Sequence, residues 1–337
     1  MRERQLIELI ARRCGPPRNP RVLCAIGDDA AVVEAKPVCV VSTDTLVEDV
    51  HFTLARYAPA EIGHKALATA LSDLAAMGAE AGEAYLALGL PARLREEFLR
   101  ELIDGIVDLA ERHGVTIAGG DVVDSSALTL TVTVVGWAED RERLVYRAGA
   151  RPGQRVGVTG ALGGAGAALL LENCERDRPV PLAPGQRRAL EERLKRPRPR
   201  LREGLLLAES GVAAMIDLSD GLAGDARQLA ERSGVRLRID LAALPLATGV
   251  AEVAAAQGLA AEELAATAGE DYELLFTVAD ERVAAVEAAL ASVGCPVTWV
   301  GTVEVGAGLV LIDRAGRRRC DLRGFEHGRV AAERERG

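Results

Sequence analysis

Hydrophobic and polar positions along the chain predict short strands that alternate with amphipathic helices. The run PVCVVS predicts a buried strand over residues 37–42, and apolar residues at helical spacing predict a helix over 61–77 that ends at Gly78. By the same reasoning, the N-terminal part contains a short amphipathic helix at its start, strands over 84–90, 115–118 and 128–135, and a helix over 95–113.

The pattern breaks near residues 147–155, where RAGARPGQR gathers Gly, Pro and Arg, so we expect a domain boundary there. The predicted domains are 1–148 and 149–337, each long enough to bury a core of its own. A polar, Pro-rich passage up to residue 200 is expected on the surface. The elements predicted beyond the boundary are strands over 156–159, 213–217, 236–240, 272–278, 297–303 and 309–313, and helices over 165–172, 222–232 and about 280–293. The predicted class is a two-domain α/β (α+β) fold.

Composition narrows the class of protein further. Of 337 residues, 49% are hydrophobic, which excludes intrinsic disorder, and only 3% are aromatic. The net charge of -9, with so few aromatic rings, disfavours nucleic acid as a partner. The six cysteines form no CxxC pair and the four histidines do not cluster, so reduced thiols are expected and a zinc site is not. Neither a signal peptide nor a membrane span is evident, and we expect a cytoplasmic protein with no membrane partner.

Acidic residues stand beside small residues at the ends of several predicted elements. Each one alone is also typical of a helix cap or a turn, although Asp73 lies inside a predicted helix, where Asp is unfavourable. Since strand ends converge on the ligand crevice of α/β sheets, the set as a whole favours one shared site. The acids concerned are Asp28 and Asp29 in GDD, Asp44 after the strand at 37–42, Asp73, Asp121 in GGD, Asp217 and Asp220 in DLSDG, and Glu270 and Asp271 in GED.

Such a convergence needs cations. Two like charges 4 Å apart repel by about 4 kcal/mol at an effective dielectric constant near 20. Mg²⁺ prefers oxygen ligands and commonly bridges carboxylates to phosphate. The acids therefore predict a polyphosphate site with several Mg²⁺ ions.

The common phosphate-binding motifs are missing. The chain contains no GxxxxGK[ST] and no protein-kinase motif. A glycine-rich run over residues 160–166 opens a predicted helix. It has two interpretations: its backbone amides bind a phosphate, or its glycines allow tight packing of strand against helix.

Taken in order, seven segments resemble the thiamine-monophosphate kinase family, within the superfamily that includes aminoimidazole ribonucleotide synthetase and selenophosphate synthetase. The combination of VEDVHF, SDLAAMGA and GEDYELLF distinguishes this family from its relatives. The segments are IGDDAAV (26–32), STDTLVEDVHF (42–52), IGHKALATALSDLAAMGA (62–79), AGGD (118–121), VTGALGGAGAALLL (158–171), IDLSDGLAGD (216–225) and GEDYELLFTV (269–278), and Gly324-Phe325 resembles the family's terminal segment.

The resemblance implies an aminoimidazole ribonucleotide synthetase-like fold and the transfer of phosphate from ATP to thiamine phosphate. It also implies a homodimer in which the N-terminal domains pair into a β-barrel-like core, each flanked by a C-terminal α/β domain. By matching positions it assigns metal binding to Asp28, Ser42, Thr43, Asp44, Asp73, Asp121, Asp217 and Asp220; ATP binding to Gly120, Asp121, Arg147 and Ser219; thiamine phosphate binding to His51, Glu270 and Phe325; and catalysis to Asp44, Asp73 and Asp121.

Three alternatives stay open. His51 either contacts substrate or orients the VEDVHF loop. Ile103 stands where the family often has a tyrosine near ATP, so apolar packing replaces that contact. The chain as a whole is alternatively an aminoimidazole ribonucleotide synthetase-like enzyme or a nucleotide-binding module without activity.

Overall fold

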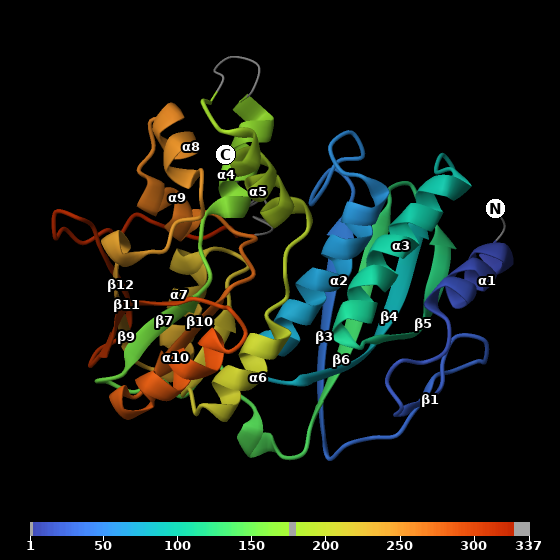
Figure 1. The fold of residues 1–337 in the computed structure, drawn as a ribbon, viewed down its shortest axis with the longest axis horizontal. Coiled ribbons are helices and arrows are strands. Elements are labelled where there is room, and N and C mark those ends of the chain that lie inside the picture. The colour runs from blue at the N-terminus through green and yellow to red at the C-terminus, as the bar shows by residue number, and fades with distance from the viewer. Residues whose placement is uncertain (1–2, 175–179, 327–337) are drawn as a thin grey trace, which may run out of the picture.

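The computed structural model describes residues 3–174 and 180–326, and it has two α/β halves, each built around its own sheet (Figure 1). The four-stranded sheet of the N-terminal half has the order β3-β6-β4-β5, and the six-stranded sheet of the C-terminal half has the order β12-β9-β11-β7-β10-β8. The predicted mixed α/β class is confirmed. Residues 327–337, the end of the predicted second domain, lie outside the described residues.

The elements of the N-terminal half run through residue 138. Over residues 3–138 there are three α-helices and six strands, and the first two strands form a separate small ribbon. Their bounds are α1 (Glu3–Cys14), β1 (Val22–Cys24), β2 (Val32–Val33), β3 (Val38–Val47), α2 (Pro59–Ala76), β4 (Glu80–Leu90), α3 (Glu96–His113), β5 (Thr116–Asp124) and β6 (Thr129–Ala138).

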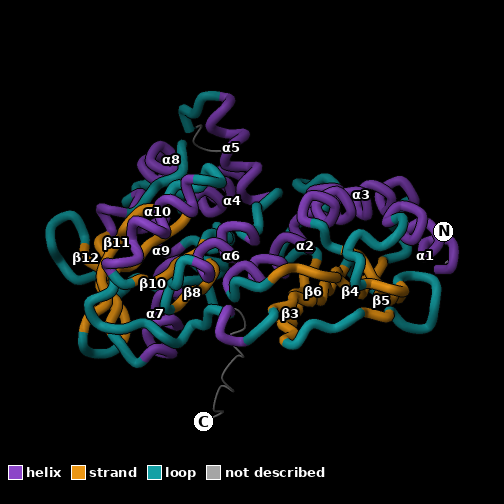
Figure 2. Tube along the Cα trace, turned by 60° about the horizontal axis from the view of Figure 1, so that its bottom comes forward, coloured by secondary structure: helices purple, strands orange, loops and turns teal. Residues whose placement is uncertain are grey.

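Helices α2 and α3 lie together on one side of the four-stranded sheet (Figure 2). Successive side chains on a strand point to opposite faces, so β3 presents two different surfaces. Ser42 and Asp44 face α2, where the Ser42 hydroxyl donates to Asp73. Thr43 faces the other way and shares a 2.9 Å hydrogen bond with Thr133 of β6. We call this second surface the open face.

The C-terminal half is a mostly antiparallel sheet with helices packed around it. Only β12 and β9 pair in parallel within this sheet. The bounds are β7 (Arg155–Thr159), α4 (Gly164–Cys174), α5 (Pro184–Lys195), α6 (Leu201–Glu209), β8 (Ala214–Asp217), α7 (Leu222–Ser233), β9 (Arg236–Asp240), α8 (Val250–Ala256), α9 (Ala261–Thr267), β10 (Leu274–Val278), α10 (Val283–Ala291), β11 (Val297–Glu304) and β12 (Gly308–Ile312).

Helix α2 lies between the two halves and packs against both, so it is buried on nearly every side. It packs on α3, β3 and β6 within its own half and on α6 and β8 of the other half. Its small residues permit this close approach. A Cβ on Gly63 would lie 2.0 Å from the Leu102 backbone oxygen, and a Cβ on Gly204 of α6 would lie 2.1 Å from that of Ala75.

The structure corrects several sequence predictions. The strand expected at 37–42 continues to Val47, and the one expected at 115–118 continues to Asp124, so Asp44 and Asp121 lie within strands and not after them. The passage before residue 200, expected on the surface, contains α5, whose Leu190 and Leu194 are buried. Helices α6, α8 and α9 were not predicted.

Candidate active site

A cavity of about 700 Å³ lies between the two halves, and we call it the central cavity. Its volume is typical of a small-molecule site. Strand β3, helix α2 and the loop between them form one wall, and α4, α9 and the loops after β8 and before β10 form the other. The predicted site residues that line it are Asp44, His51, Asp73, Asp217, Ser219, Asp220, Glu270 and Phe325.

Three aspartates meet where α2 passes between the two sheets. Asp44 comes from β3, Asp73 from α2 and Asp217 from the end of β8. The hydroxyl of Ser72, next to Asp73 on the helix, donates to Asp217 Oδ2 at 2.8 Å. Within residues 3–174 and 180–326, none of the three carboxylates forms a salt bridge. We call these three residues the acidic cluster.

Burial and mutual repulsion raise the pKa values of the acidic cluster. The pKa of Asp44 rises to about 6 because it is buried and because Asp73 is charged. The pKa of Asp217 rises to about 7 through burial and then through Asp73. Burial also raises the pKa of Asp73. The cluster therefore resists carrying its full negative charge unless a positive charge enters the cavity.

The described residues include no three His, Cys, Asp or Glu side chains close enough to form a complete metal centre by themselves. Mg²⁺ rarely needs one, because it keeps several waters and usually takes one or two carboxylates together with substrate phosphates. Carboxylate and hydroxyl oxygens, here from the acidic cluster and Ser42, are donors of that kind. The donor set thus fits a hard divalent cation that arrives with a phosphate.

Two loops of the C-terminal half run side by side at the cavity. The Glu270 N–H donates to the Ser219 carbonyl at 2.8 Å, and the Tyr272 N–H donates to the Leu218 carbonyl at 2.9 Å. Glu270 has φ 69°, in the left-handed region that non-glycine residues rarely adopt. The DLSDG and GED motifs, which are distant in sequence, therefore form one unit.

His51 and Phe325 reach the cavity from opposite walls. His51 Nδ1 accepts a hydrogen bond of 3.1 Å from the Val47 N–H, so the ring also fixes the turn that follows β3. The Phe325 N–H donates to the Asp220 carbonyl at 2.7 Å, and the side chain is 59% exposed. Contact with a ligand and orientation of the loop are therefore compatible roles for His51.

Other predicted residues do not line the central cavity. Arg147 donates to Gln228 at 2.8 Å, although its charge acts on Asp73 and Asp217 and favours their ionised forms. Asp28 accepts from the neighbouring backbone N–H in an exposed loop. Ser42 touches the site through Asp73, whereas Thr43 belongs to the open face.

Gly120 and Asp121 lie on β5, which β6 and β4 separate from β3. Asp121 pairs with Ala87, and Ala87 pairs with Thr131, whose hydroxyl meets that of Thr45 at 2.9 Å. This register places Asp121 on the open face, away from the acidic cluster. Ile103 is 1% exposed and belongs to the core of the N-terminal half.

The glycine-rich run serves packing. A Cβ on Gly160 would lie 2.1 Å from Glu273 Oε1, and one on Gly166 would lie 2.2 Å from Ala268 Cβ. The amide of Gly163, beside the start of α4, donates to Asp271 Oδ2 at 2.7 Å. The Gly163 amide is therefore already bonded to a carboxylate of the protein, and of the two interpretations the close packing of the glycines favours packing of strand against helix.

Sequence reasoning missed several buried polar residues of the site. Tyr57 forms part of its wall, Lys65 contacts the Tyr57 hydroxyl from behind at 3.4 Å, and Asp225 accepts from the Asp220 N–H at 3.1 Å. Burial, together with the charges of Asp217 and Asp220, raises the pKa of Asp225 to about 8. The available signal for Lys65 was a charged residue on an otherwise apolar helix face.

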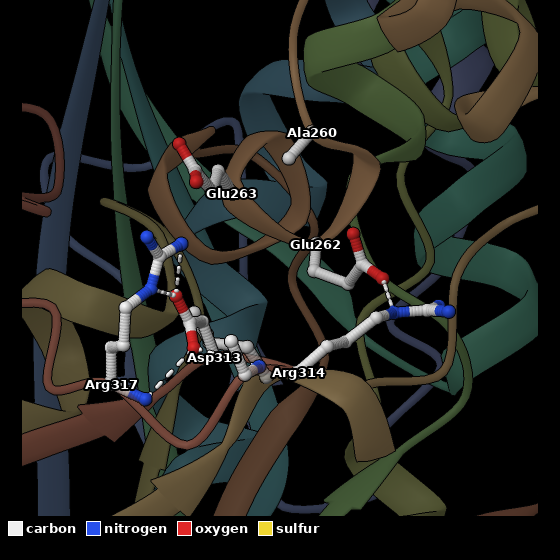
Figure 3. A pocket seen from close by; sticks show the side chains of 8 residues that line it. Ala260, Glu262, Glu263, Asp313, Arg314 and Arg317 are labelled. Atoms are coloured by element: carbon white, nitrogen blue, oxygen red, sulfur yellow. Dashed lines mark hydrogen bonds and ion pairs between the residues drawn. The ribbon is translucent and has the colours of Figure 1, made fainter.

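A second, smaller cavity of about 210 Å³ lies beside α9 and the turn that follows β12 (Figure 3). Two of its three carboxylates pair with arginines of the same cavity, since Asp313 lies 2.7 Å from Arg317 Nη2 and Glu262 pairs with Arg314. The third, Glu263, pairs with Arg319 outside the cavity. None of the predicted site residues lines it.

The central cavity lies between two units that match known families. Residues 27–138 match the AIR synthase related protein N-terminal domain, and residues 151–314 match the corresponding C-terminal domain. The chain therefore belongs to the class of AIR synthase related proteins.

Individual relatives narrow the class. The thiamine-monophosphate kinase of Escherichia coli strain K12 is 36% identical over 326 residues, which cover 95% of this chain and 97% of the relative. A crystal structure of thiamine-monophosphate kinase from Stenotrophomonas maltophilia K279a has a TM-score of 0.81 at 34% identity and covers 91% of this chain and 95% of its own. A structure of AaThiL complexed with AMPPCP and TMP has a TM-score of 0.76 at 32% identity, covering 97% and 99%. The chain belongs to the thiamine-monophosphate kinase family.

Proposed function

We propose that this protein transfers the γ-phosphoryl group of ATP to thiamine phosphate, giving ADP and thiamine diphosphate. The acidic cluster carries this proposal, because its half-buried or buried carboxylates form no salt bridge in the described chain and line a cavity of small-molecule size. Family membership supports the choice of substrates, since a relative of 32% identity is a complex with AMPPCP and TMP.

The reaction is a direct in-line attack by a phosphate oxygen of thiamine phosphate on the γ-phosphorus of ATP. That oxygen is largely ionised at neutral pH, so the attack needs no strong general base. Bound Mg²⁺ would neutralise the two polyanions and the charge that develops between them. Asp44, Asp73 and Asp217 would hold the ions, and the charge of Arg147, which acts on Asp73 and Asp217, would also attract phosphate oxygens.

The polar loops and the apolar side chains that line the cavity have different roles in binding the substrates. Ser219 and Asp220 stand on the loop beside Glu270, so a phosphate and the organic part of a substrate can be bound by one rigid unit. Apolar side chains of the same cavity, Leu46, Leu169 and Leu264, would pack on the heterocycles and exclude water.

The proposal includes a homodimer formed through the open face. Val41 and Val123 on this side of the sheet are 60% and 52% exposed, and a second copy laid on it would cover them. Such pairing, a β-barrel-like core in the resemblance, also puts Gly120 and Asp121 at the interface, which accounts for their distance from the acidic cluster. Sedimentation should give twice the mass of the 35.5 kDa chain.

No helix of the described residues is long and apolar enough to cross a membrane. The cytoplasm, where ATP is made and used, remains our proposed location for the enzyme.

A product assay tests the function. Incubation with ATP, Mg²⁺ and thiamine phosphate, followed by anion-exchange chromatography, should yield thiamine diphosphate, and free thiamine should be a poor acceptor. Equal use of both acceptors would refute a dedicated monophosphate kinase. Formation of ADP that requires an amide substrate would favour the aminoimidazole ribonucleotide synthetase-like alternative.

A further inference from the structure

Lys65 is a completely buried ammonium group that lies behind the wall of the central cavity, in contact with the lining residues Glu270 and Tyr57. Its side chain is 0% exposed, and its Nζ lies 2.7 Å from Glu270 Oε1. The same Nζ lies 3.4 Å from the Tyr57 hydroxyl and 5.3 Å from the centre of the Tyr57 ring. Lysine is almost never fully buried unless it is paired, so these contacts define what Lys65 does in the fold.

Glu270 is held from two sides. Its backbone, with φ 69°, is fixed by the hydrogen bond of its N–H to Ser219, and its carboxylate is fixed by Lys65. The side chain is 30% exposed and lines the cavity. A carboxylate accepts through both oxygens. Oε1 is held by Lys65, and because the side chain lines the cavity, Oε2 can accept from a donor or pair with a positive charge on a ligand.

Tyr57 completes this arrangement from the N-terminal half. Its ring has two ammonium groups nearby, because Lys195 Nζ lies 5.4 Å from the ring centre and Lys65 Nζ lies 5.3 Å from it. Lys195, however, donates to the Arg56 carbonyl at 2.7 Å and pairs with Glu172 at 3.6 Å. Both lysines therefore lie near one ring, but of the two only Lys65 forms an ion pair with Glu270.

We propose that Lys65 is a positioning residue for thiamine phosphate, which fixes the Glu270 carboxylate and the Tyr57 hydroxyl in the geometry that binds the organic part of the substrate. The inference rests on the proposed function and extends it to a residue on α2, in the other half of the molecule. Because Lys65 balances the charge of Glu270, the pair adds no net negative charge beside the phosphates.

The test is a double-mutant cycle on KM. Lys65→Met removes the ammonium group and leaves a side chain of similar length, and Glu270 stays partly exposed to water, so the variant should fold. We expect its KM for thiamine phosphate to rise by at least about tenfold, the worth of one charge-assisted hydrogen bond, with little change in the KM for ATP. In a Glu270→Gln background the same substitution should change KM by less than about threefold.

Lys195→Met is the matched control, because it removes the other cation near Tyr57 without touching Glu270, and its KM should shift by less than about threefold. An unchanged KM in Lys65→Met, or an equal rise in both backgrounds, would overturn the inference. Lys65→Gln is the second neutral variant. If neither neutral variant folds, as judged by circular dichroism, Lys65 is structural and the inference is likewise overturned.

Failure of the proposed function looks different. In that case the wild-type enzyme itself forms no thiamine diphosphate, before any variant is compared. Wild-type turnover with an unshifted KM in Lys65→Met refutes the role of Lys65 alone.

Discussion

The central cavity and the smaller cavity beside α9 are both lined by carboxylates, yet they neutralise charge in different ways. In the smaller cavity, Arg317 and Arg314 pair with Asp313 and Glu262 (Figure 3). In the central cavity, the acidic cluster forms no salt bridge within the described chain, and Arg147 acts on it only from a distance.

The pKa values of the same residue type move in opposite directions as a result. The pKa of Asp313 lies below its ordinary value, chiefly because the Arg317 N–H donates to it. The pKa of Asp217 rises to about 7 through burial. A carboxylate that the fold has already neutralised stabilises a turn, whereas one that the fold leaves buried and uncompensated is suited to a ligand that brings positive charge.

The largest expected effect separates the cavities by activity. Asp44→Asn or Asp73→Asn should lower kcat by at least about 100-fold, because each removes a charge needed to hold the cations at the transferring phosphate. Asp313→Asn, in the smaller cavity, should leave kcat at the wild-type value. Steady-state assays at saturating Mg²⁺ measure kcat in each variant. Near-normal turnover in either cluster variant would contradict a catalytic role for the acidic cluster.

The second effect is on stability without ligands. At pH 8 in EDTA, Asp217→Asn should increase the free energy of unfolding by about 2–3 kcal/mol, because it relieves repulsion and keeps an acceptor for Ser72. Asp313→Asn should not stabilise the fold, since Asp313 accepts from the backbone amides of Ala315 and Arg317. Urea unfolding measures both, and a loss of stability in Asp217→Asn would contradict uncompensated charge in the cluster.

A buried base on α2 provides a contrast in pH dependence. His64 Nε2 lies 2.9 Å from the Pro197 carbonyl, which can only accept, so Nε2 donates. Burial lowers the His64 pKa from 6.5 to about 4. The unfolded chain therefore binds this proton first, and stability is lost as the pH falls from 6.5 toward 4. Between pH 7 and pH 5, the free energy of unfolding of the wild type should fall by about 2 kcal/mol more than that of His64→Gln. Urea unfolding at the two pH values measures this, and an equal change in both proteins would contradict it.

The smallest effect concerns the rim of the smaller cavity. Arg314→Gln breaks an ion pair whose arginine is 73% exposed, so the unfolding free energy should change by less than about 0.5 kcal/mol. Its kcat should equal that of the wild type. A large loss of activity would assign the smaller cavity a function that its paired charges do not suggest.

The sequence predicted which acids lie at the site better than it predicted the strands that carry them. The acids at 44, 73, 217 and 270 line one cavity, as the sequence predicts, whereas Asp28 and Asp121, predicted for the same site, do not. The predicted reason is also partly wrong, because both sheets contain antiparallel pairs and Asp44 lies within a strand. Strand β3 continues past its apolar first half because Thr43 and Thr45 form hydrogen bonds on the open face, while Asp44 faces α2. When polar residues occupy successive positions of one strand, the sequence alone does not show which of them point toward the site and which point to the opposite face.

Helices α5, α6, α8 and α9 escaped prediction, and the seven-residue helices α8 and α9 are so short that tertiary contacts, more than local pattern, define them. Lys65 escaped for a related reason. Its partner Glu270 lies about two hundred positions away in the sequence, and only the packing of α2 against the second half brings the two together. Pairing across domains cannot be read from local spacing.

The central claim is that the acidic cluster binds phosphates through divalent cations. Isothermal titration of the wild-type enzyme with a non-hydrolysable ATP analogue tests it directly, with Mg²⁺ in one titration and EDTA in the other. We predict clear binding with Mg²⁺ and at least a tenfold weaker affinity, about 1.4 kcal/mol, in EDTA. Equal affinity in the two titrations would contradict the claim.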